Sequence, residues 1–141
     1  MSKPRVLVLC TGNSARSQMA EGLLRHFHGG RFEVASAGTA PSRVRPEAVA
    51  VMGELGIDIS AQRSKHVDEL AGQPFDYVLT VCDQARESCP VLPGAVSFHH
   101  DVADPAGAGG SEATRLAEFR RARDELRAYL DAWVPSLRAL E

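Results

Sequence analysis

The stretch VLVLCTGNSARSQMAEGLL, residues 6–24, decides the fold of this chain. The aliphatic run at residues 5–9 is typical of a strand covered on both faces in a parallel sheet. Cys10 follows it, then five small or polar residues and Arg16. From residue 17 to residue 28 the apolar side chains recur at helical spacing, and two glycines end the pattern. The stretch therefore predicts a strand, a short loop and a helix in direct succession.

The rest of the chain alternates strands and helices in the same way. Strands are predicted at residues 32–37, 75–82 and 95–100, helices at residues 46–56 and 111–134, and a short helical turn at residues 66–70. Pro46 suits the first position of a helix, and Pro135 should disturb the end of the last one. Strands separated by helices predict right-handed βαβ units. We expect one α/β domain over residues 1–141, a three-layer sandwich around a four-stranded parallel sheet.

Length and composition limit the possible functions. A chain of 141 residues can bury one complete core, and a formal net charge of -2 provides no overall basic field for nucleic acid. No apolar run approaches the ~18 to 20 residues that span a bilayer, and the N-terminal apolar stretch is too brief for a signal peptide. Three cysteines are too few for a secreted disulfide framework. We therefore expect a cytoplasmic monomer without nucleic-acid or membrane partners.

Reactive side chains follow three of the predicted strands. Cys10 follows the first strand, Cys82 closes the third, and the loop HHDVADP at residues 99–105 follows the fourth. In parallel α/β sheets, ligands bind outside the carboxyl ends of the strands, where the chain reverses its direction of winding. We therefore expect these three regions to share one edge of the molecule.

The loop after Cys10 has the features of an anion-binding site. A loop of small residues that passes directly into a helix directs backbone N–H groups and the positive helix end at one point. The same field favours the nucleophilic thiolate of Cys10, and Arg16 adds a charged fork suited to two oxygens of a tetrahedral oxyanion. The oxyanion-binding residues assigned on this basis are Thr11, Gly12, Asn13, Ser14, Ala15, Arg16 and Ser17.

Four of these loop residues have more specific expected roles. Gly12 and Ala15 leave space for the oxygens of the ligand, and Asn13 tolerates a left-handed backbone. The hydroxyl of Ser17 can hydrogen-bond the sulfur of Cys10. The alternative is that Cys10 is only the last residue of a buried strand. The C-x5-R-S pattern between a strand and a helix favours the oxyanion site.

The segment CTGNSARSQMAEG, residues 10–22, resembles the phosphate-binding loop of the low-molecular-weight protein tyrosine phosphatases and of the arsenate reductases that share their fold. DPAG, residues 104–107, matches the Asp-Pro loop of these families, which implies that Asp104 is a general acid. The resemblance covers nearly the whole chain and also includes SAG at residues 36–38 and IDIS at residues 57–60. It leaves a choice between a phosphatase and a reductase.

The other two cysteines favour the reductase. Phosphoryl transfer through one cysteine is redox neutral, whereas reducing arsenate to arsenite takes two electrons, which two thiols supply by forming a disulfide. The resemblance to thioredoxin-coupled arsenate reductases implies that Cys10 attacks arsenic, Cys82 attacks Cys10, and Cys89 attacks Cys82. The disulfide between Cys82 and Cys89 would then be reduced by a thioredoxin-type partner, with glutaredoxin or another thiol as the alternative donor. This activity implies a role in arsenic detoxification.

The spacing of Cys82 and Cys89 has a geometric consequence. Seven residues of helix separate two Cα atoms by roughly 10 Å, whereas a disulfide needs about 4.4 to 6.8 Å. We therefore expect residues 82–89 to rearrange on oxidation and to bring one of the two cysteines toward solvent.

Two other functions fit parts of the sequence. Phosphatases of the resembled fold usually have a second cysteine where this chain has Ala15, and tyrosines where it has Ala106 and Gly107. A phosphotyrosine ring would therefore lose stacking worth about 0.5 to 1.5 kcal/mol, although weak phosphatase activity can persist. A non-catalytic redox sensor, in which Cys82 and Cys89 switch a partner surface, is the third interpretation.

No metal or bound cofactor is expected. C-x6-C lacks the spacing of zinc ligands, and of the neighbouring His99 and His100 we expect one to be packed and one solvated. Some members of the resembled family hold a potassium ion beside the loop. Arg63 and Lys65 stand here at two of the positions that supply its ligands, so we expect the ammonium of Lys65 to replace that ion.

Overall fold

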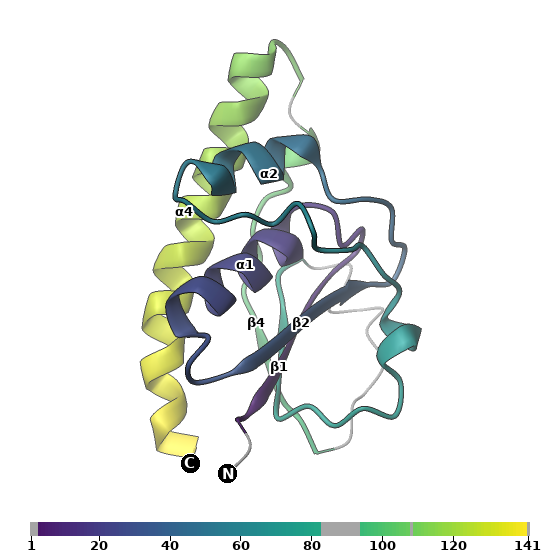
Figure 1. Cartoon of the computed structure of the whole chain (residues 1–141), viewed down its shortest axis with the longest axis vertical. Helices are drawn as coiled ribbons and strands as arrows, with labels where there is room; N and C mark the ends of the chain where they lie inside the picture. Colours follow the sequence, from purple (N-terminus) through teal and green to yellow (C-terminus); the bar gives the residue numbers. More distant parts are fainter. Residues whose placement is uncertain (1–2, 83–93, 108, 141) are drawn as a thin grey trace.

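The computed structural model describes residues 3–82, 94–107 and 109–140. Within these ranges four parallel strands form one sheet, in the order β2-β1-β3-β4 (Figure 1). The strands are β1 Arg5–Cys10, β2 Glu33–Gly38, β3 Tyr77–Thr80 and β4 Val96–His99. The predicted α/β fold with a four-stranded parallel sheet is confirmed.

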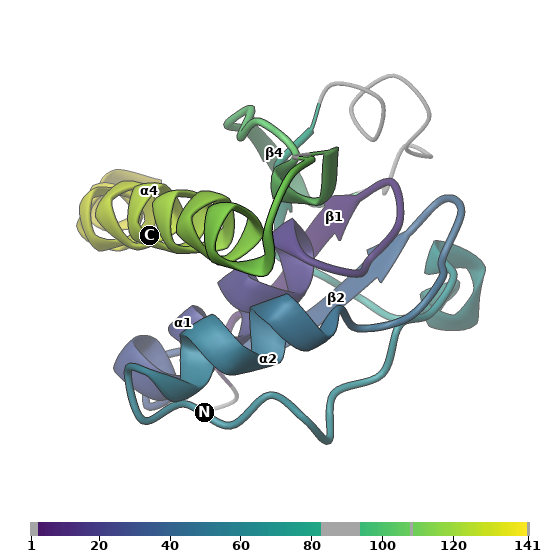
Figure 2. The same cartoon turned by 90° about the horizontal axis from the view of Figure 1, so that it is seen from above.

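Helical segments cover both faces of the sheet. The α-helices are α1 Arg16–His28, α2 Pro46–Gly53 and α4 Glu112–Ser136, and 3-10 helices span Val67–Leu70, Pro105–Gly107 and Leu137–Leu140. Figure 2 shows α1, α2 and α4 on one side of the sheet, where α2 packs against α1 and α4. On the other side, Val67 and Leu70 line a hollow together with Leu7 of β1. The sheet thus lies between two layers.

The core lies between β1 and the helices α1 and α4. Residues 6–9 of β1 are each at most 1% exposed, as expected of a strand with neighbours on every side. The two helices contribute the buried side chains Met19, Leu23, Leu24, Phe119, Leu126 and Leu130. These positions agree with the helical spacing, whereas Phe27 of the same pattern is 39% exposed. No helix in the described part of the chain is both long and apolar enough to cross a bilayer.

Helix ends agree with the sequence signals only in part. Gly56, at φ 78°, closes the turn after α2, and the N–H of Ile57 reaches back to the carbonyl of Met52 at 3.1 Å. α2 itself ends at Gly53, three residues before the predicted end at Gly56, and Gly56 closes the turn that follows because its backbone adopts this conformation without strain. α4 continues through Pro135 to Ser136 before it tightens into a 3-10 helix. The helix therefore ends two residues beyond the predicted residue 134.

β3 is shorter than its aliphatic run. It covers residues 77–80 instead of the predicted 75–82. The N–H of Val81 still bonds the carbonyl of Leu9 at 2.9 Å, but Cys82 then leaves the strand direction and its sulfur contacts Thr11. The apolar run thus predicts burial correctly and strand length incorrectly.

The chain reverses its direction of winding at β1, because β2 pairs with one edge of β1 and β3 with the other. Cys10 is the last residue of β1 and lies opposite Gly38 of β2. A Cβ at Gly38 would overlap the carbonyl oxygen of Thr11. The absence of a side chain there lets the loop after β1 leave the sheet at the switch point, where ligand sites of this fold class form.

Candidate active site

Cys10 is 2% exposed and lines a hollow of about 230 Å³ at the carboxyl edge of the sheet. The hollow is formed by the loop after β1, by the segment before α2 and by the loop after β4. Its lining comprises residues 10–12 and 14–16 together with Ser42, Arg45, Asp104 and Ala106. Cys10, the loop assigned to oxyanion binding and Asp104 thus meet at one place.

The carbonyl groups of the loop bond the segments around it. The N–H groups of residues 40, 42 and 45 donate to the carbonyl oxygens of residues 11, 12 and 14 at 2.9, 3.1 and 2.9 Å. The side-chain amide of Gln18 donates to the carbonyl of Asn13 at 3.0 Å, and the N–H of Met19 to that of Ala15 at 2.8 Å. These bonds occupy the carbonyl oxygens of the loop on the sides that face residues 40–45 and α1. The backbone N–H groups of the loop are therefore left for the hollow.

Those donors are the backbone N–H groups of residues 12–17, which bond no other described residue. Asn13 has φ 45°, the left-handed conformation that the sequence predicts for it, and this turn bends the loop into a cradle. α1 begins at Arg16, and the residue before it, Ala15, offers no side-chain cap. The open first turn and the cradle together present backbone N–H groups in the arrangement that the sequence predicts for oxyanion binding, and that role stays a prediction.

A buried hydrogen bond holds the sulfur of Cys10. The Ser17 hydroxyl lies 2.9 Å from Cys10 Sγ, and Asn13 Nδ2 donates to the same hydroxyl at 2.7 Å. Because Ser17 Oγ accepts from Asn13, its own hydrogen is available for the sulfur. Both Asn13 and Ser17 are fully buried. The contact expected between Ser17 and Cys10 is therefore present and is oriented by Asn13.

This network continues away from the hollow to α1. Asn13 Nδ2 also donates to Ser36 Oγ at 3.0 Å, and Ser36 donates to Glu21 Oε1 at 2.6 Å. The other carboxylate oxygen of Glu21 binds Arg25 Nη2 at 2.9 Å. A continuous series of polar contacts thus joins a half-exposed arginine to the nucleophile.

Lys65 does not take the position expected for it. Its ammonium donates to the carbonyl of Arg63 at 3.3 Å, while Arg25 forms the direct ion pair with Glu21. Burial lowers the pKa of Lys65, although the charge of Glu21 opposes this. The lysine contributes through its backbone, whose N–H donates to Asn13 Oδ1 at 3.0 Å.

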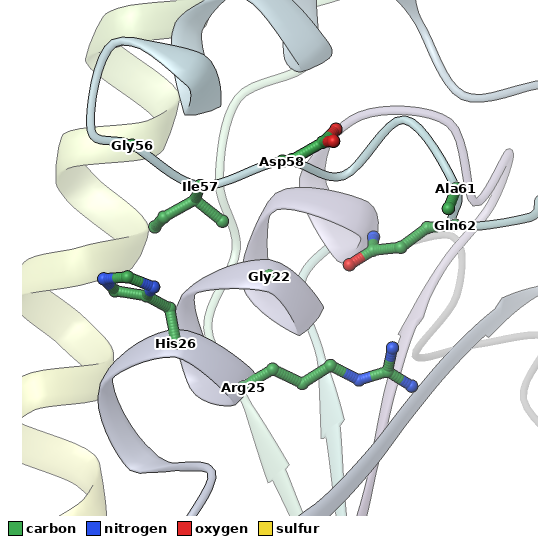
Figure 3. A pocket seen from close by; sticks show the side chains of 8 residues that line it. All are labelled: Gly22, Arg25, His26, Gly56, Ile57, Asp58, Ala61 and Gln62. Carbon is green, nitrogen blue, oxygen red and sulfur yellow. The ribbon is translucent and has the colours of Figure 1, made fainter.

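A second hollow, of about 350 Å³, lies between α1 and the segment at residues 56–62. Figure 3 shows Arg25 and His26 extending from α1, with Ile57, Asp58 and Gln62 above them. Its lining residues include no cysteine. It lies at the outer end of the polar network, whereas the hollow at Cys10 contains the nucleophile.

Arg16 links the cradle to the Asp-Pro loop. Its side chain is only 12% exposed, and Nη1 donates to the carbonyl of Val102 at 2.8 Å. Nη2 lies 3.7 Å from Asp104 Oδ2, and the other oxygen of Asp104 accepts the N–H of Ala106 at 2.9 Å. Asp104 thus faces the hollow with a fixed carboxylate that is 52% exposed. The carboxylate is therefore accessible from both the solvent and the hollow.

Cys82 lies against the other end of the cradle. It is 4% exposed, and its sulfur accepts the N–H of Thr11 and contacts Thr11 Oγ1, both at 3.3 Å. Thr11 directly follows Cys10 in the chain, so the residue that contacts the sulfur of Cys82 is the neighbour of the residue that carries the other sulfur. Both thiols are free. Cys89 lies outside the described residues, so its disulfide with Cys82 and the rearrangement of residues 82–89 stay predictions.

The two neighbouring histidines are both half-buried, so the expectation that one is packed and one solvated is wrong. His99 Nδ1 lies 2.7 Å from Thr80 Oγ1. His100 lies beyond β4, stacks on Tyr129 with ring centroids 4.1 Å apart, and places Nε2 3.5 Å from Glu125. Strand alternation fails because β4 ends at His99. No group of three or more metal-ligating side chains occurs in residues 3–82, 94–107 and 109–140.

Four residues that support the site were not assigned from the sequence. Gln18 is buried and bonds the loop, and Ser64 Oγ donates to the carbonyl of Gly12 at 3.1 Å. Ser42 and Arg45 line the hollow. The only sequence signal was the polar Gln18 and Glu21 beside the apolar Met19 and Ala20 of the helix. Nothing in the sequence brings residues 42–45 and 64 to the loop.

The family model for low molecular weight phosphotyrosine protein phosphatases matches residues 5–140. Among curated relatives, an arsenate reductase from Shouchella clausii (strain KSM-K16) is 45% identical over 133 residues, which cover 92% of this chain and 94% of that protein. The family match spans the sheet, the cradle and the Asp-Pro loop.

Two solved structures carry the comparison further. A thioredoxin-dependent arsenate reductase from Corynebacterium glutamicum has a TM-score of 0.78 at 26% identity, over 99% of this chain and 64% of that chain. A low molecular weight protein tyrosine phosphatase from T. tengcongensis has a TM-score of 0.80 at 29% identity, over 96% of this chain and all of that one. By its sequence, its parallel sheet and the loop that leaves β1, this chain belongs to the low molecular weight phosphotyrosine protein phosphatase family.

Proposed function

We propose that this chain is an arsenate reductase that works through Cys10, Cys82 and Cys89 and receives electrons from a thioredoxin-type partner. One observation carries the proposal: a second buried thiol, Cys82, is bound to the cradle by Thr11. Phosphoryl transfer needs only one thiol. The 45% identity to an arsenate reductase over 92% of the chain supports the same choice.

In the proposed binding step, arsenate enters the cradle and its oxygens accept the N–H groups of residues 12–17. Arg16 supplies the charged fork, because its hydrogen bond to Val102 and its ion pair with Asp104 hold the guanidinium at the wall of the hollow. Ser17 holds the sulfur of Cys10 at the end of β1. The sulfur of Cys10 and the arsenic atom are thereby brought together before the reaction.

The proposed chemistry transfers two electrons in three steps. The Cys10 thiolate forms a bond to arsenic, and one arsenate oxygen leaves as water after protonation, with Asp104 as a proton donor. The Cys82 thiolate then attacks the Cys10 sulfur, and the electron pair of the sulfur–arsenic bond stays on arsenic, which leaves as arsenite. Cys89 finally attacks Cys82, which frees Cys10 and places the disulfide between Cys82 and Cys89.

Turnover in the presence of thioredoxin, thioredoxin reductase and NADPH tests this proposal. One NADPH should be consumed for each arsenate reduced, because the disulfide must be opened once per cycle. Cys10→Ser should abolish the reaction, and Cys89→Ser should stop it after a single turnover. Replacement of thioredoxin by glutaredoxin and glutathione identifies the donor. A wild-type chain that consumes no NADPH with arsenate would disprove the reductase.

Hydrolysis of phosphomonoesters is the second candidate function. The phosphatase from T. tengcongensis supports it through a TM-score of 0.80. No described residue that lines the hollow is aromatic, so a phosphotyrosine ring would find no stacking wall. We expect slow hydrolysis of p-nitrophenyl phosphate that depends on Cys10 and survives Cys89→Ser. If the chain hydrolysed p-nitrophenyl phosphate faster than it reduced arsenate, phosphatase activity would become its primary function.

We further propose that residues 1–141 act as one domain, as a monomer in the cytoplasm, and without potassium. Arg25 supports the last point, because it already pairs the carboxylate of Glu21. Exchange of potassium for choline should leave the KM for arsenate unchanged. A potassium-dependent KM would contradict this part of the proposal.

A further inference from the structure

Arg45 is a second arginine at the hollow that contains Cys10. It precedes α2, is half-buried and lines the hollow together with Arg16 and Asp104. Its backbone is fixed on both sides: its N–H donates to the carbonyl of Ser14 at 2.9 Å, and Pro46 follows as the first residue of α2. The guanidinium therefore extends from a backbone that is attached to the cradle itself.

The two arginines of the hollow differ in what they already bind. Arg16 donates to Val102 and pairs with Asp104. Arg45 forms no side-chain hydrogen bond or ion pair with any residue in the described ranges. No residue in the described ranges therefore neutralises its positive charge, and its donors are available for a ligand.

We propose that Arg45 is a specificity-determining residue: its guanidinium binds the incoming arsenate at the mouth of the hollow and favours the charged substrate over the uncharged product. At neutral pH arsenate carries one or two negative charges, whereas arsenite is a neutral acid. A fixed cation therefore attracts the substrate and has no comparable attraction for the product. This inference rests on the proposed function.

Arg43 provides a matched control within the same segment. It is exposed, does not line the hollow, and carries the same charge two residues away. Arg45→Gln and Arg43→Gln therefore change the net charge equally and differ only in the site. Arg45→Lys keeps the charge and removes the planar fork.

The first test measures phosphate binding, which needs no arsenate reduction. Phosphate should protect Cys10 from iodoacetamide, an uncharged reagent that Arg45 does not attract, and peptide mass spectrometry reports alkylation at Cys10. At 50 mM NaCl we expect Arg45→Gln to weaken phosphate binding about three- to tenfold, and Arg43→Gln to leave it within error. The difference should shrink in 500 mM NaCl, and Arg45→Lys should retain most of the affinity.

The second test uses arsenate turnover. Arg45→Gln should raise the KM for arsenate by the same factor as the phosphate constant and leave kcat within twofold, because the contact is made before chemistry. Equal phosphate constants for Arg45→Gln and Arg43→Gln would overturn the inference, whatever the wild-type turnover. If wild type reduces no arsenate but phosphate binding still depends on Arg45, the proposed reaction fails while the anion contact stands.

Discussion

Two polar networks in this molecule use the same chemistry in opposite surroundings. The network from Arg25 through Glu21 to Cys10 is buried, and the side chain of Glu21 is 3% exposed. The cluster at the junction of α2 and α4 is centred on Glu54, which is 39% exposed and binds Arg120 and Arg123 at 2.8 Å each.

The difference between these networks lies in what surrounds each charge. Hydrogen bonds from Arg120 and then Arg123 lower the pKa of Glu54 to about 2, but water screens the cluster and limits what it adds to stability. A buried group that loses its partner cannot bond water instead, so each missing contact has its full cost. The buried network therefore fixes the position of the Cys10 sulfur, and the exposed cluster joins two helices.

A pair of glycine substitutions should separate the two regions most strongly. Gly38→Ala places a Cβ against the carbonyl of Thr11 and should lower the free energy of unfolding by about 2 to 4 kcal/mol. Gly53→Ala in α2 meets no atom within 4 Å and should raise it by about 0.5 to 1 kcal/mol, because alanine favours helix. Urea unfolding measures both. If both substitutions changed the free energy of unfolding equally, the loop after Cys10 would have to shift to accommodate the added Cβ at residue 38.

The same substitution in both networks gives a smaller contrast. Glu21→Gln leaves Arg25 without its carboxylate and should lower the free energy of unfolding by about 1 to 3 kcal/mol. It should also slow alkylation of Cys10, because an uncharged amide accepts more weakly from Ser36, which in turn orients Asn13. Glu54→Gln should leave that rate unchanged. A Glu21→Gln protein with wild-type alkylation would mean that the network ends before the sulfur.

The smallest expected effect is a pH dependence at the exposed cluster. The pKa of Glu54 is lowered from 4.5 to about 2 in the folded chain, so its contribution to stability is complete above pH 4.5 and is lost as the pH falls toward 2. Glu54→Gln should reduce the decline of Tm between pH 4.5 and pH 2. Some decline will persist, because the pKa values of Asp58 and Glu69 are lowered too. An unchanged slope would contradict a stabilising role for the cluster.

The sequence-based predictions succeeded where the structure depends on neighbouring residues and failed where it depends on residues far apart in the chain. The strand, loop and helix of residues 5–28 were predicted nearly to the residue, because strand and helix periods and the left-handed Asn13 are local properties of the chain. The end of β3 was predicted two residues late, because a contact between Cys82 and Thr11, 71 positions apart, bends the chain there. The half-buried state of His100 was missed because it depends on Tyr129 of a distant helix.

The sequence by itself determined the order of strands and helices, the loop between Cys10 and α1 and the family resemblance, since these depend on residues close together in the chain. The tertiary structure decided which partners complete the site. It brought Arg45 to the wall of the hollow, Arg25 instead of Lys65 to Glu21, and Thr11 to the sulfur of Cys82. Such pairings depend on how separate segments pack across the edge of the sheet, and no local pattern encodes that geometry.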